Sequence, residues 1–463
     1  MTDNPDNNEQ PDDTTPPDDT TLPDDTTPPD RTATTPHSEQ AALDARQSSR
    51  RKFLAGIGAV GVAGFGATLF ETLRHTSPAK PSPLTKTQPS SGATTAQRGD
   101  GIVVLVTLYG GNDGLNTVVP YTNSTYASSR GDLAIRAEEV LVLDAELGLN
   151  PGLQGFKDLW DAKRLAVVRG VGYPNPNRSH FRSMDIWQSG IPDRVETTGW
   201  LGRWLDSTDH DPMLGLAIGT TLPLALRGKI ASAAVVPPGR FTLPASPTLD
   251  TSFRSMASIA SSDTSLRGAL ANANHDLITV QQRLANIDNA DAAQPSLEQG
   301  PTPNTANGLS AQLDVVAKAI RNNSPTRVYS VSLGGFDTHA TERAAHIELH
   351  HTLGDAVARF LKQLDGRPEA ANVAVLIYSE FGRRVTANAS GGTDHGTAAP
   401  VFVAGPRVHG GFYGEQPNLT DLDQGDLKYN TDFRSVYATL LDRVLDTDPN
   451  KILATTTRPL PFL

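Results

Sequence analysis

The stretch of sequence that decides the fold is RVYSVSLGGFDTHATERAAHIELHHTLGDAVARFLKQLDGRPEAANVAVLIYS, residues 327–379. Its two ends, residues 327–333 and 372–379, are short apolar runs rich in β-branched side chains, a pattern typical of buried strands. Between them, residues 341–364 carry apolar side chains at helical spacing. Because a crossover of this length joins parallel strands, the stretch predicts a βαβ unit. We therefore expect an α/β fold with a mostly parallel central sheet and helices on both faces.

The same patterns recur on both sides of this unit. Residues 101–108 (GIVVLVTL) and 400–405 (PVFVAG) predict two more buried strands. Residues 310–322 predict a helix just ahead of the βαβ unit, and residues 431–446 predict a C-terminal helix with Thr431 as its N-cap.

The chain divides into a leader, a signal, a linker and one domain. Residues 1–48 repeat the motif PDDTT, whose prolines and paired aspartates cannot collapse into a core, so we expect a disordered acidic leader. Residues 76–99 are a linker rich in Pro, Ser and Thr. Residues 100–463 are expected to form one domain, with a mobile, polar and Pro-rich insertion near residues 285–308.

Residues 49–75 are expected to be an export signal. Twin arginines precede a Gly- and Ala-rich apolar stretch, SRRKFLAGIGAVGVAGFGATLF, which is typical of the bacterial twin-arginine pathway. We expect the export translocon as a partner during secretion and a final location in the periplasm, at the cell surface or outside the cell. If the signal is kept rather than removed, it acts as a membrane tether, because its apolar part nearly spans a bilayer.

Composition excludes several classes of function. Residues 1–48 hold twelve acidic residues against two arginines, so ten of the eleven net negative charges belong to the leader. The remainder has no basic stripe, and we expect no nucleic-acid partner. The chain has no cysteine, which excludes disulfides, thiolate metal ligands and a catalytic cysteine.

Each predicted strand of the sheet adjoins a loop that carries acidic or imidazole side chains. The carboxyl ends of strands in open α/β sheets line the ligand crevice, so we expect these loops to converge. Carboxylates and imidazoles without thiolates suit one or two divalent metal ions, with zinc or manganese favoured and calcium or magnesium also allowed. The candidate metal ligands are Asp113, Asp337, His339, Glu380, Asp394 and His395.

A further loop, NPNRSHFRSMDIWQSG, places Ser179 where a helix begins. A hydroxyl at a helix N-terminus is a candidate nucleophile, because developing negative charge is stabilised there. The alternative is that Ser179 is an ordinary N-cap and His180 a packed or surface histidine. His346 and His350 are one helical turn apart, a spacing that ligands use, but we expect them on the exposed face of their helix.

These stretches together resemble the exported bacterial family called domain of unknown function 1501. The resemblance covers the chain from residue 50 to its end and rests on RRKFL, LYGGNDGLNTVVPY, NRSHFRSMDIWQSG, TGWLGRWL, GGFDTH, YSEFGRRVTANASGGTDHGTAAPVFVAG and GGFYGEQPNL. That family is placed with the alkaline phosphatase-like and sulfatase-like superfamily, whose members are metal-dependent enzymes that cleave phosphate or sulfate esters. The resemblance therefore implies an alkaline phosphatase-like fold.

The resemblance also implies roles for residues of this chain. Asp113 takes the position of a metal carboxylate, and Asp337 with His339 that of a later Asp/His pair. Phe381 stands where the superfamily has a metal-binding histidine, and Asp394 is the residue that would compensate for this departure. Among hydroxyl nucleophiles, Ser179 matches best and Thr117 second.

The sequence thus predicts an exported metal-dependent hydrolase of phosphate-type esters, and less so of sulfate esters, since the sulfatase signature is missing. The substrate is a small-molecule or polymer ester. Ser179 or a water molecule would attack, and Arg383 or Arg178 would bind the ester oxygens. The alternative is a non-catalytic secreted module that uses the same fold to bind cell-envelope polymer or a partner protein.

Overall fold

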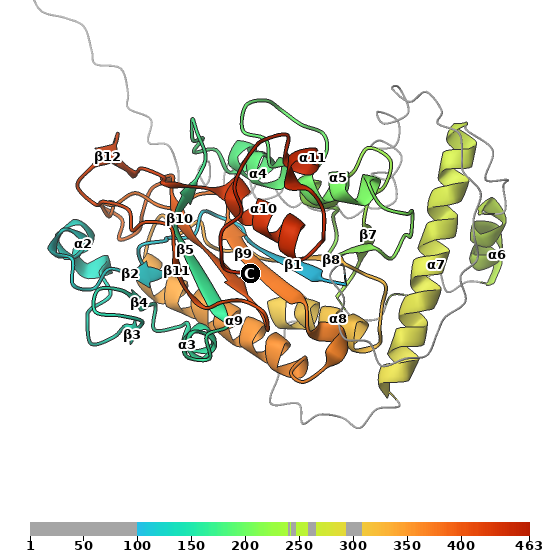
Figure 1. Ribbon diagram of the computed structural model, residues 1–463, viewed down its shortest axis with the longest axis horizontal. Helices are drawn as coiled ribbons and strands as arrows, with labels where there is room; N and C mark the ends of the chain where they lie inside the picture. The colour runs from blue at the N-terminus through green and yellow to red at the C-terminus, as the bar shows by residue number, and fades with distance from the viewer. Residues whose placement is uncertain (1–99, 239–240, 242–246, 258–264, 293–307) are drawn as a thin grey trace, which may run out of the picture. The chain divides into compact units, whose positions relative to one another are not determined.

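The computed structural model describes residues 100–463 except 239–240, 242–246, 258–264 and 293–307 (Figure 1). All described residues belong to one compact unit, Thr72–Leu463. The expected leader (1–48), export signal (49–75) and linker (76–99) lie outside the described residues.

A nine-stranded sheet forms the centre of the fold (Figure 1). Its hydrogen-bonded order is β11-β5-β10-β9-β1-β8-β6-β7, and β14 also pairs with β5. Neighbouring strands run parallel, except that β10 is antiparallel to both β5 and β9. The strands are β1 (Ile102–Leu108), β5 (Leu165–Gly172), β6 (Gly215–Ile218), β7 (Ala234–Val236), β8 (Val328–Leu333), β9 (Val373–Ser379), β10 (Ala399–Ala404), β11 (Gly411–Tyr413) and β14 (Thr431–Asp432).

Helices cover both faces of the sheet, because its central strands are apolar throughout. All seven residues of β1 are buried, and successive side chains point to opposite faces. Val104 and Val106 pack in the core shared with α3, α8 and α9, whereas Val103 and Leu105 pack in the core shared with α4, α5, α10 and α11 (Figure 1). The helices are α3 (Gln154–Asp161), α4 (His180–Ser189), α5 (Trp200–Asp206), α8 (Leu309–Arg321), α9 (Glu342–Gln363), α10 (Phe433–Arg443) and α11 (Pro449–Leu453).

Smaller elements complete the described part of the chain. Strands β2, β4 and β3 form a three-stranded sheet, and β12 with β13 forms a two-stranded one. None of the helices in the described ranges has the length and hydropathy to cross a membrane. The elements are β2 (Val118–Val119), α2 (Ser124–Arg130), η1 (Gly131–Leu133), β3 (Leu141–Val142), β4 (Gly148–Leu149), η2 (Leu224–Leu226), α6 (Pro247–Met256), α7 (Leu266–Ala292), η3 (Pro368–Ala370), β12 (Leu422–Asp423) and β13 (Asp426–Leu427).

The predicted α/β class with a mostly parallel sheet is confirmed, and β1, β8, β9, β10, α8 and α9 match the expected elements. The predicted N-cap is wrong. Thr431 pairs with Val171 in the sheet, and the carboxylate of Asp432 accepts from the backbone N–H of Arg434 at 2.9 Å and caps α10. Residues 285–292, expected to begin an insertion, are the end of α7, and residues 293–307 lie outside the described part.

The reversed direction of β10 decides where the functional loops lie. Strands β1, β5, β8 and β9 share one direction, so their carboxyl ends reach the same edge of the sheet. Because β10 runs the opposite way, the loop that precedes it reaches that edge too. We call this the carboxyl edge of the sheet.

Candidate metal centre

Four side chains at the carboxyl edge form a cluster, which we call the His–Asp cluster: His180, Asp337, His339 and His395. His180 begins α4 after β5, Asp337 and His339 follow β8, and His395 precedes β10. Asp337 Oδ1 lies 3.0 Å from His339 Nε2, 3.3 Å from His395 Nε2 and 3.4 Å from His180 Nε2. The Nε2 atoms of His339 and His395 are 2.9 Å apart. Candidate ligand atoms of His180, Asp337 and His395 all lie within 4.8 Å of one another.

The second ring nitrogen of His180 is held by a buried carboxylate. Glu380 is 1% exposed, and its Oε1 lies 2.8 Å from His180 Nδ1. Glu380 also accepts from the backbone N–H of Gly110 at 2.9 Å and from the Ser379 hydroxyl at 2.8 Å. In the tautomer in which Nδ1 of His180 donates to this carboxylate, the Nε2 lone pair faces the cluster. Glu380, expected to bind a metal ion, instead orients a histidine.

The rings of His395 and His339 are oriented in the same way. His395 Nδ1 donates to the backbone carbonyl of Arg178 at 2.8 Å. His339 Nδ1 lies 3.4 Å from Asp394 Oδ1, and that oxygen also accepts from Asn388 Nδ2 at 3.2 Å. A carbonyl or carboxylate acceptor on each Nδ1 leaves each Nε2 free to bind an ion, which is how histidine ligands are oriented in metal sites.

The donor atoms of the His–Asp cluster fit a divalent metal ion. Ligands of a tetrahedral ion with bonds of about 2.0–2.1 Å lie about 3.3 Å apart. Asp337 Oδ1 lies 3.3 Å from His395 Nε2 and 3.4 Å from His180 Nε2, and the candidate ligand atoms of these three residues lie within 4.8 Å of one another. His180 Nε2 is buried and makes no hydrogen bond within the described residues. Nitrogen and oxygen donors in this number suit zinc or manganese.

Arg383 holds the loops of the carboxyl edge together. It is 1% exposed, and its Nε donates to the Gly111 carbonyl at 2.6 Å, Nη1 to the Thr393 carbonyl at 2.8 Å and Nη2 to Asp337 Oδ1 at 2.8 Å. Nη2 also donates to the carbonyls of Gly110 and Phe336. Every nitrogen of the guanidinium is used, so Arg383 positions Asp337 and is not placed to bind ester oxygens, the role that its sequence context suggested.

The charge of Arg383 also keeps Asp337 ionised. Burial alone would raise the pKa of Asp337, but the hydrogen bond and the charge of Arg383 outweigh it and lower the pKa to about 2. Burial lowers the pKa of His395, and the nearby Arg383 adds to that effect. The pKa of Asp394 is lowered, first by its hydrogen bond from Asn388. The cluster therefore offers an ionised Asp337 carboxylate and a neutral His395 imidazole, the protonation states that metal binding requires.

Glycines let the ligand loops approach closely. A Cβ on Gly392 would lie 2.4 Å from the backbone carbon of His339, and one on Gly396 would lie 2.6 Å from that of Arg383. Because any side chain at either position would push the loops apart, these glycines allow Asp394 and His395 to reach the cluster.

The structure places Asp113 in a separate buried ion pair. Its two carboxylate oxygens accept from Arg130, through Nη1 and, at 2.8 Å, through Nη2, and both side chains are 0% exposed. Burial would raise the pKa of Asp113, but the charge of Arg130 lowers it. Both carboxylate oxygens are taken by Arg130, and no described contact joins Asp113 to the His–Asp cluster. Its side chain therefore does not take the ligand position that the sequence suggested.

His346 and His350 are buried, not exposed as expected from the sequence. They are 1% and 0% exposed, because α9 packs between the sheet and the loop that follows β1. His346 Nε2 lies 2.9 Å from Asn112 Oδ1, and His350 Nε2 lies 3.1 Å from the Thr117 hydroxyl. Thr117 is itself 0% exposed, which keeps its hydroxyl from any substrate.

Of the remaining predicted residues, Ser179 is exposed and Arg178 is paired. The Ser179 side chain makes no cap hydrogen bond to α4. Arg178 donates through Nε to Asp426 Oδ2 at 2.7 Å, and Asp426 is 1% exposed. Arg178 is therefore engaged by a buried carboxylate, while its backbone carbonyl holds His395.

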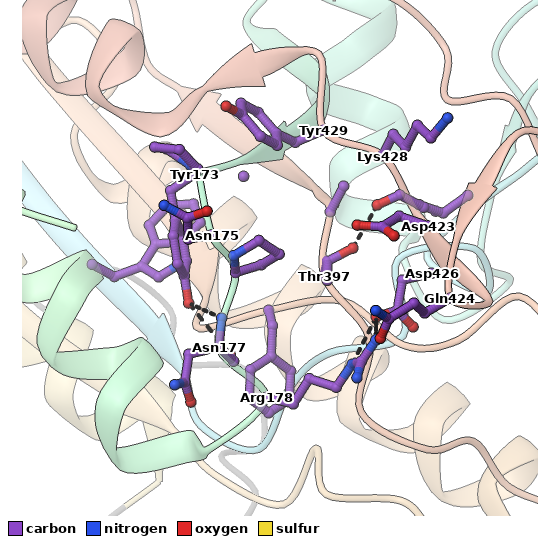
Figure 2. Close-up of a pocket in the computed structure, with 17 residues that line it drawn as sticks. Tyr173, Asn175, Asn177, Arg178, Thr397, Asp423, Gln424, Asp426, Lys428 and Tyr429 are labelled. Carbon is purple, nitrogen blue, oxygen red and sulfur yellow. Dashed lines mark hydrogen bonds and ion pairs between the residues drawn. The ribbon is translucent and has the colours of Figure 1, made fainter. Parts of the chain in front are cut away.

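A cavity of about 680 Å³ opens beside the cluster (Figure 2). Arg178 and Phe381 line it and also contact the cluster, since the ring of Phe381 lies 4.9 Å from the rings of both His180 and His395. Tyr173 and Asn175 lie on one side of the cavity, with Asp423, Gln424 and Asp426 across from them in the view of Figure 2. The cavity is large enough for a small-molecule ligand.

His180 is the residue that sequence reasoning missed. Phe381 occupies a position where a metal-binding histidine was expected, and the ring of His180 packs against it. The imidazole is thus supplied by the start of α4, far away in sequence. The signal that could have found it was its place directly after Ser179, in a loop at the carboxyl end of a buried strand.

Comparisons with other proteins support the family assignment but add little about chemistry. Residues 169–459 match the model of a family described as "Protein of unknown function (DUF1501)". No curated protein matches the sequence.

Three solved structures show weak likeness. A protein in the alkaline phosphatase superfamily from Vibrio parahaemolyticus is 9% identical with a TM-score of 0.36, covering 79% of this chain and 70% of that one. The C-terminal periplasmic domain of EcEptC from Escherichia coli, in complex with Zn, is 10% identical with a TM-score of 0.34, covering 79% and 92%. An alkaline phosphatase from the Antarctic bacterium TAB5 is 12% identical with a TM-score of 0.33, covering 68% and 95%. At these TM-scores we infer function from the site alone.

Proposed function

The chain belongs to the DUF1501 family, and for this member of it we propose an exported, metal-dependent hydrolase of phosphate-type esters. The observation that carries the proposal is the convergence of three imidazole Nε2 atoms on Asp337, each with its Nδ1 held by an acceptor. A structural cation would not need so exposed a position, whereas Asp337 and His339 are about half exposed, at 49% and 44% of their side chains. A site open to solvent favours an ion that meets a substrate.

His180, Asp337, His339 and His395 would hold the ion. When bound, it would supply positive charge that neutralises the negative charge developing on the ester oxygens. The residues around it fix its ligands before the substrate arrives: Glu380 and the Arg178 carbonyl orient two imidazoles, and Arg383 orients Asp337. Such preorganisation is the usual source of electrostatic catalysis, because nothing has to reorganise during the reaction.

Ser179 is the nucleophile that we propose. It precedes His180 directly, its side chain is exposed, and it makes no hydrogen bond to the helix that it caps. Its oxygen would attack phosphorus as the bond between phosphorus and the alcohol oxygen breaks, and the serine proton would pass to the departing alcohol. Water would then hydrolyse the phosphoserine and release phosphate. Thr117, the other candidate, is buried. If Ser179→Ala keeps its turnover, the nucleophile is a water molecule and not Ser179.

Export is part of the proposal and rests on the twin-arginine motif, which lies outside the described residues. Twin-arginine substrates cross the membrane folded, so the His–Asp cluster would form, and could bind its ion, before export. Elemental analysis of protein purified from its exporting host measures that ion directly.

The test combines metal content with turnover. Full-length protein should contain zinc or manganese at about one ion per chain and should hydrolyse at least one of a panel of aryl phosphates, phosphodiesters and aryl sulfates. His395→Ala should lose both metal and turnover, Ser179→Ala should lose turnover and keep the metal, and His210→Ala should change neither. His210 is a matched control because its side chain is 59% exposed and pairs with Asp276 instead. Metal-loaded protein that turns over no ester would contradict the proposal.

A second function is favoured by one observation. Both arginines that could bind ester oxygens are engaged elsewhere. Arg383 donates to backbone carbonyls and to Asp337, and Arg178 donates to Asp426. A non-catalytic secreted module that binds cell-envelope polymer needs no such arginine. In that case removal of the ion lowers the melting temperature, and no ester is cleaved.

A further inference from the structure

The cavity beside the His–Asp cluster is placed to receive the rest of the substrate. Arg178 and Phe381 contribute to both the cavity wall and the cluster. The cluster and the cavity are therefore neighbouring sites separated by these two residues, and an ester with its anionic group at the cluster would reach the cavity past them. Its volume of about 680 Å³ lies within the range of sites for small organic ligands.

The cations that line the cavity are already paired with carboxylates. Arg178 Nε donates to Asp426 Oδ2 at 2.7 Å, and Arg384 Nε lies 3.6 Å from Asp426 Oδ1 just behind the lining. Lys428 forms an ion pair with Asp421. A second anionic group in the cavity would have to compete with these carboxylates for its counter-charge.

Asp423 makes the cavity unfavourable for anions in another way. Its side chain lines the cavity and is exposed, and it makes no ion pair or hydrogen bond within the described residues. With Asp421 and Asp426 it balances the charges of Arg178, Arg384 and Lys428. The cavity thus has no net charge and one unpaired carboxylate, which favours an uncharged occupant that donates hydrogen bonds.

The other exposed groups of the lining match an occupant rich in hydroxyls. The side-chain amides of Asn175 and Gln424 each offer both donors and acceptors, and neither makes a hydrogen bond within the described residues. Tyr429 adds a ring that is 38% exposed and a phenol at its tip. Figure 2 shows Tyr429 and Asn175 at one end of the cavity and Gln424 and Asp423 across from them.

We propose that this cavity binds a neutral sugar unit that forms the alcohol part of the ester. A sugar hydroxyl donates and accepts at once, so it can pair with Asp423, Asn175 and Gln424, while the C–H face of the sugar packs on the ring of Tyr429. The substrate class is then a phosphate-type ester of a neutral saccharide. This inference rests on the proposed hydrolase function, but binding can be measured without turnover.

The experiment measures binding of three neutral trisaccharides, maltotriose, cellotriose and chitotriose, to the full chain by saturation-transfer NMR. At least one should bind, and Asp423→Ala and Tyr429→Ala should each weaken it about tenfold, the effect of losing one good polar or stacking contact. Asp132→Ala is the matched control, because Asp132 is equally exposed but lies in η1, outside the cavity lining. Chelation of the ion should leave saccharide binding unchanged.

Choline chloride and inorganic phosphate are the competing probes. The inference is overturned if none of the three saccharides binds, or if both variants bind them as well as the control does. It is also overturned if only choline or only phosphate binds and Asp423→Ala or Tyr429→Ala changes the affinity for that probe. Ester turnover without saccharide binding would leave the hydrolase function standing and remove this inference. Saccharide binding without turnover of any ester would keep the cavity as a sugar-binding site and remove the hydrolase function.

Discussion

Replacing Arg383 by methionine should lower the free energy of unfolding by about 3–5 kcal/mol, the range for removing one partner of a buried charged contact. The structure supplies the reason. The carbonyls of Gly110, Gly111 and Thr393 would each lose the donor that Arg383 gives them. A buried acceptor without a partner costs about 1–3 kcal/mol, so three of them already account for about 3 kcal/mol.

One contact softens this loss and sets the lower bound. The carbonyl of Phe336 also accepts from the backbone N–H of Thr338 at 2.9 Å, so it keeps a partner in the variant. Asp337 is 49% exposed and can be hydrated. Neither group therefore contributes a full desolvation penalty in the variant.

The assay is urea unfolding followed by circular dichroism, with the midpoint and slope fitted for both proteins. Arg194→Met is the matched control, because Arg194 is 61% exposed, and its loss should change stability by less than about 0.5 kcal/mol. Zinc content provides the second readout, since Asp337 loses the residue that orients it. A loss below about 1 kcal/mol in Arg383→Met, at unchanged slope, would refute this account of the guanidinium.

Three further predictions follow from the contacts of the cluster and its surroundings. Glu380→Ala should weaken zinc binding about 10–100-fold, because His180 loses the acceptor that orients its ring; competition with a fluorescent chelator measures this, and unchanged affinity would contradict it. Asp113→Asn should leave zinc content unchanged yet destabilise the fold by about 3–5 kcal/mol, because Arg130 is left buried without its carboxylate; loss of zinc would make Asp113 a ligand after all. Glu342→Gln should flatten the pH dependence of stability. Burial, and then the charge of Asp113, raises the pKa of the Glu342 carboxyl in the folded protein. The stability that the protonated carboxyl contributes is therefore full below its pKa in the unfolded chain and is lost as the pH rises toward its pKa in the folded protein, by up to about 1.4 kcal/mol per pH unit. Urea unfolding between about pH 6 and pH 9 measures that slope, and equal slopes in wild type and variant would show that Glu342 is not protonated in the fold.

The strands of the sheet were predictable because their sequences leave no other choice. Continuous β-branched apolar runs such as IVVLVTL can only be buried on both faces. The long helix α9 requires that β8 and β9 run in the same direction, and both run parallel to β1, which lies between them. The direction of β10 was not predictable, because a strand buried on both faces shows no pattern that depends on its direction. Its neighbours β5 and β9 decide the direction through tertiary pairing.

The candidate site was predictable in part for the same reason. Asp337, His339, Asp394 and His395 come from loops next to predicted strands, and the structure brings them together. His180 and Asp113 show the limit. A single polar residue in a loop can face a cluster, a counter-ion or solvent, and the outcome depends on partners such as Glu380 and Arg130 that lie far away in the sequence.

The antiparallel pairing of β9 with β10 ties the site to the hydrogen-bond ladder between them. Residues 380–398 form the loop that joins β9 to β10, so Glu380 and His395 lie near the two ends of one loop. A two-residue slip of this ladder would displace one end of the loop by about 7 Å, more than twice the 2.9–3.4 Å separations of the donor atoms. The middle of the loop is tied to the site by other contacts, because Asn388 Nδ2 donates to the His339 carbonyl at 2.9 Å and to Asp394 Oδ1 at 3.2 Å. The geometry of the donor atoms is therefore inherited both from the sheet and from this one amide.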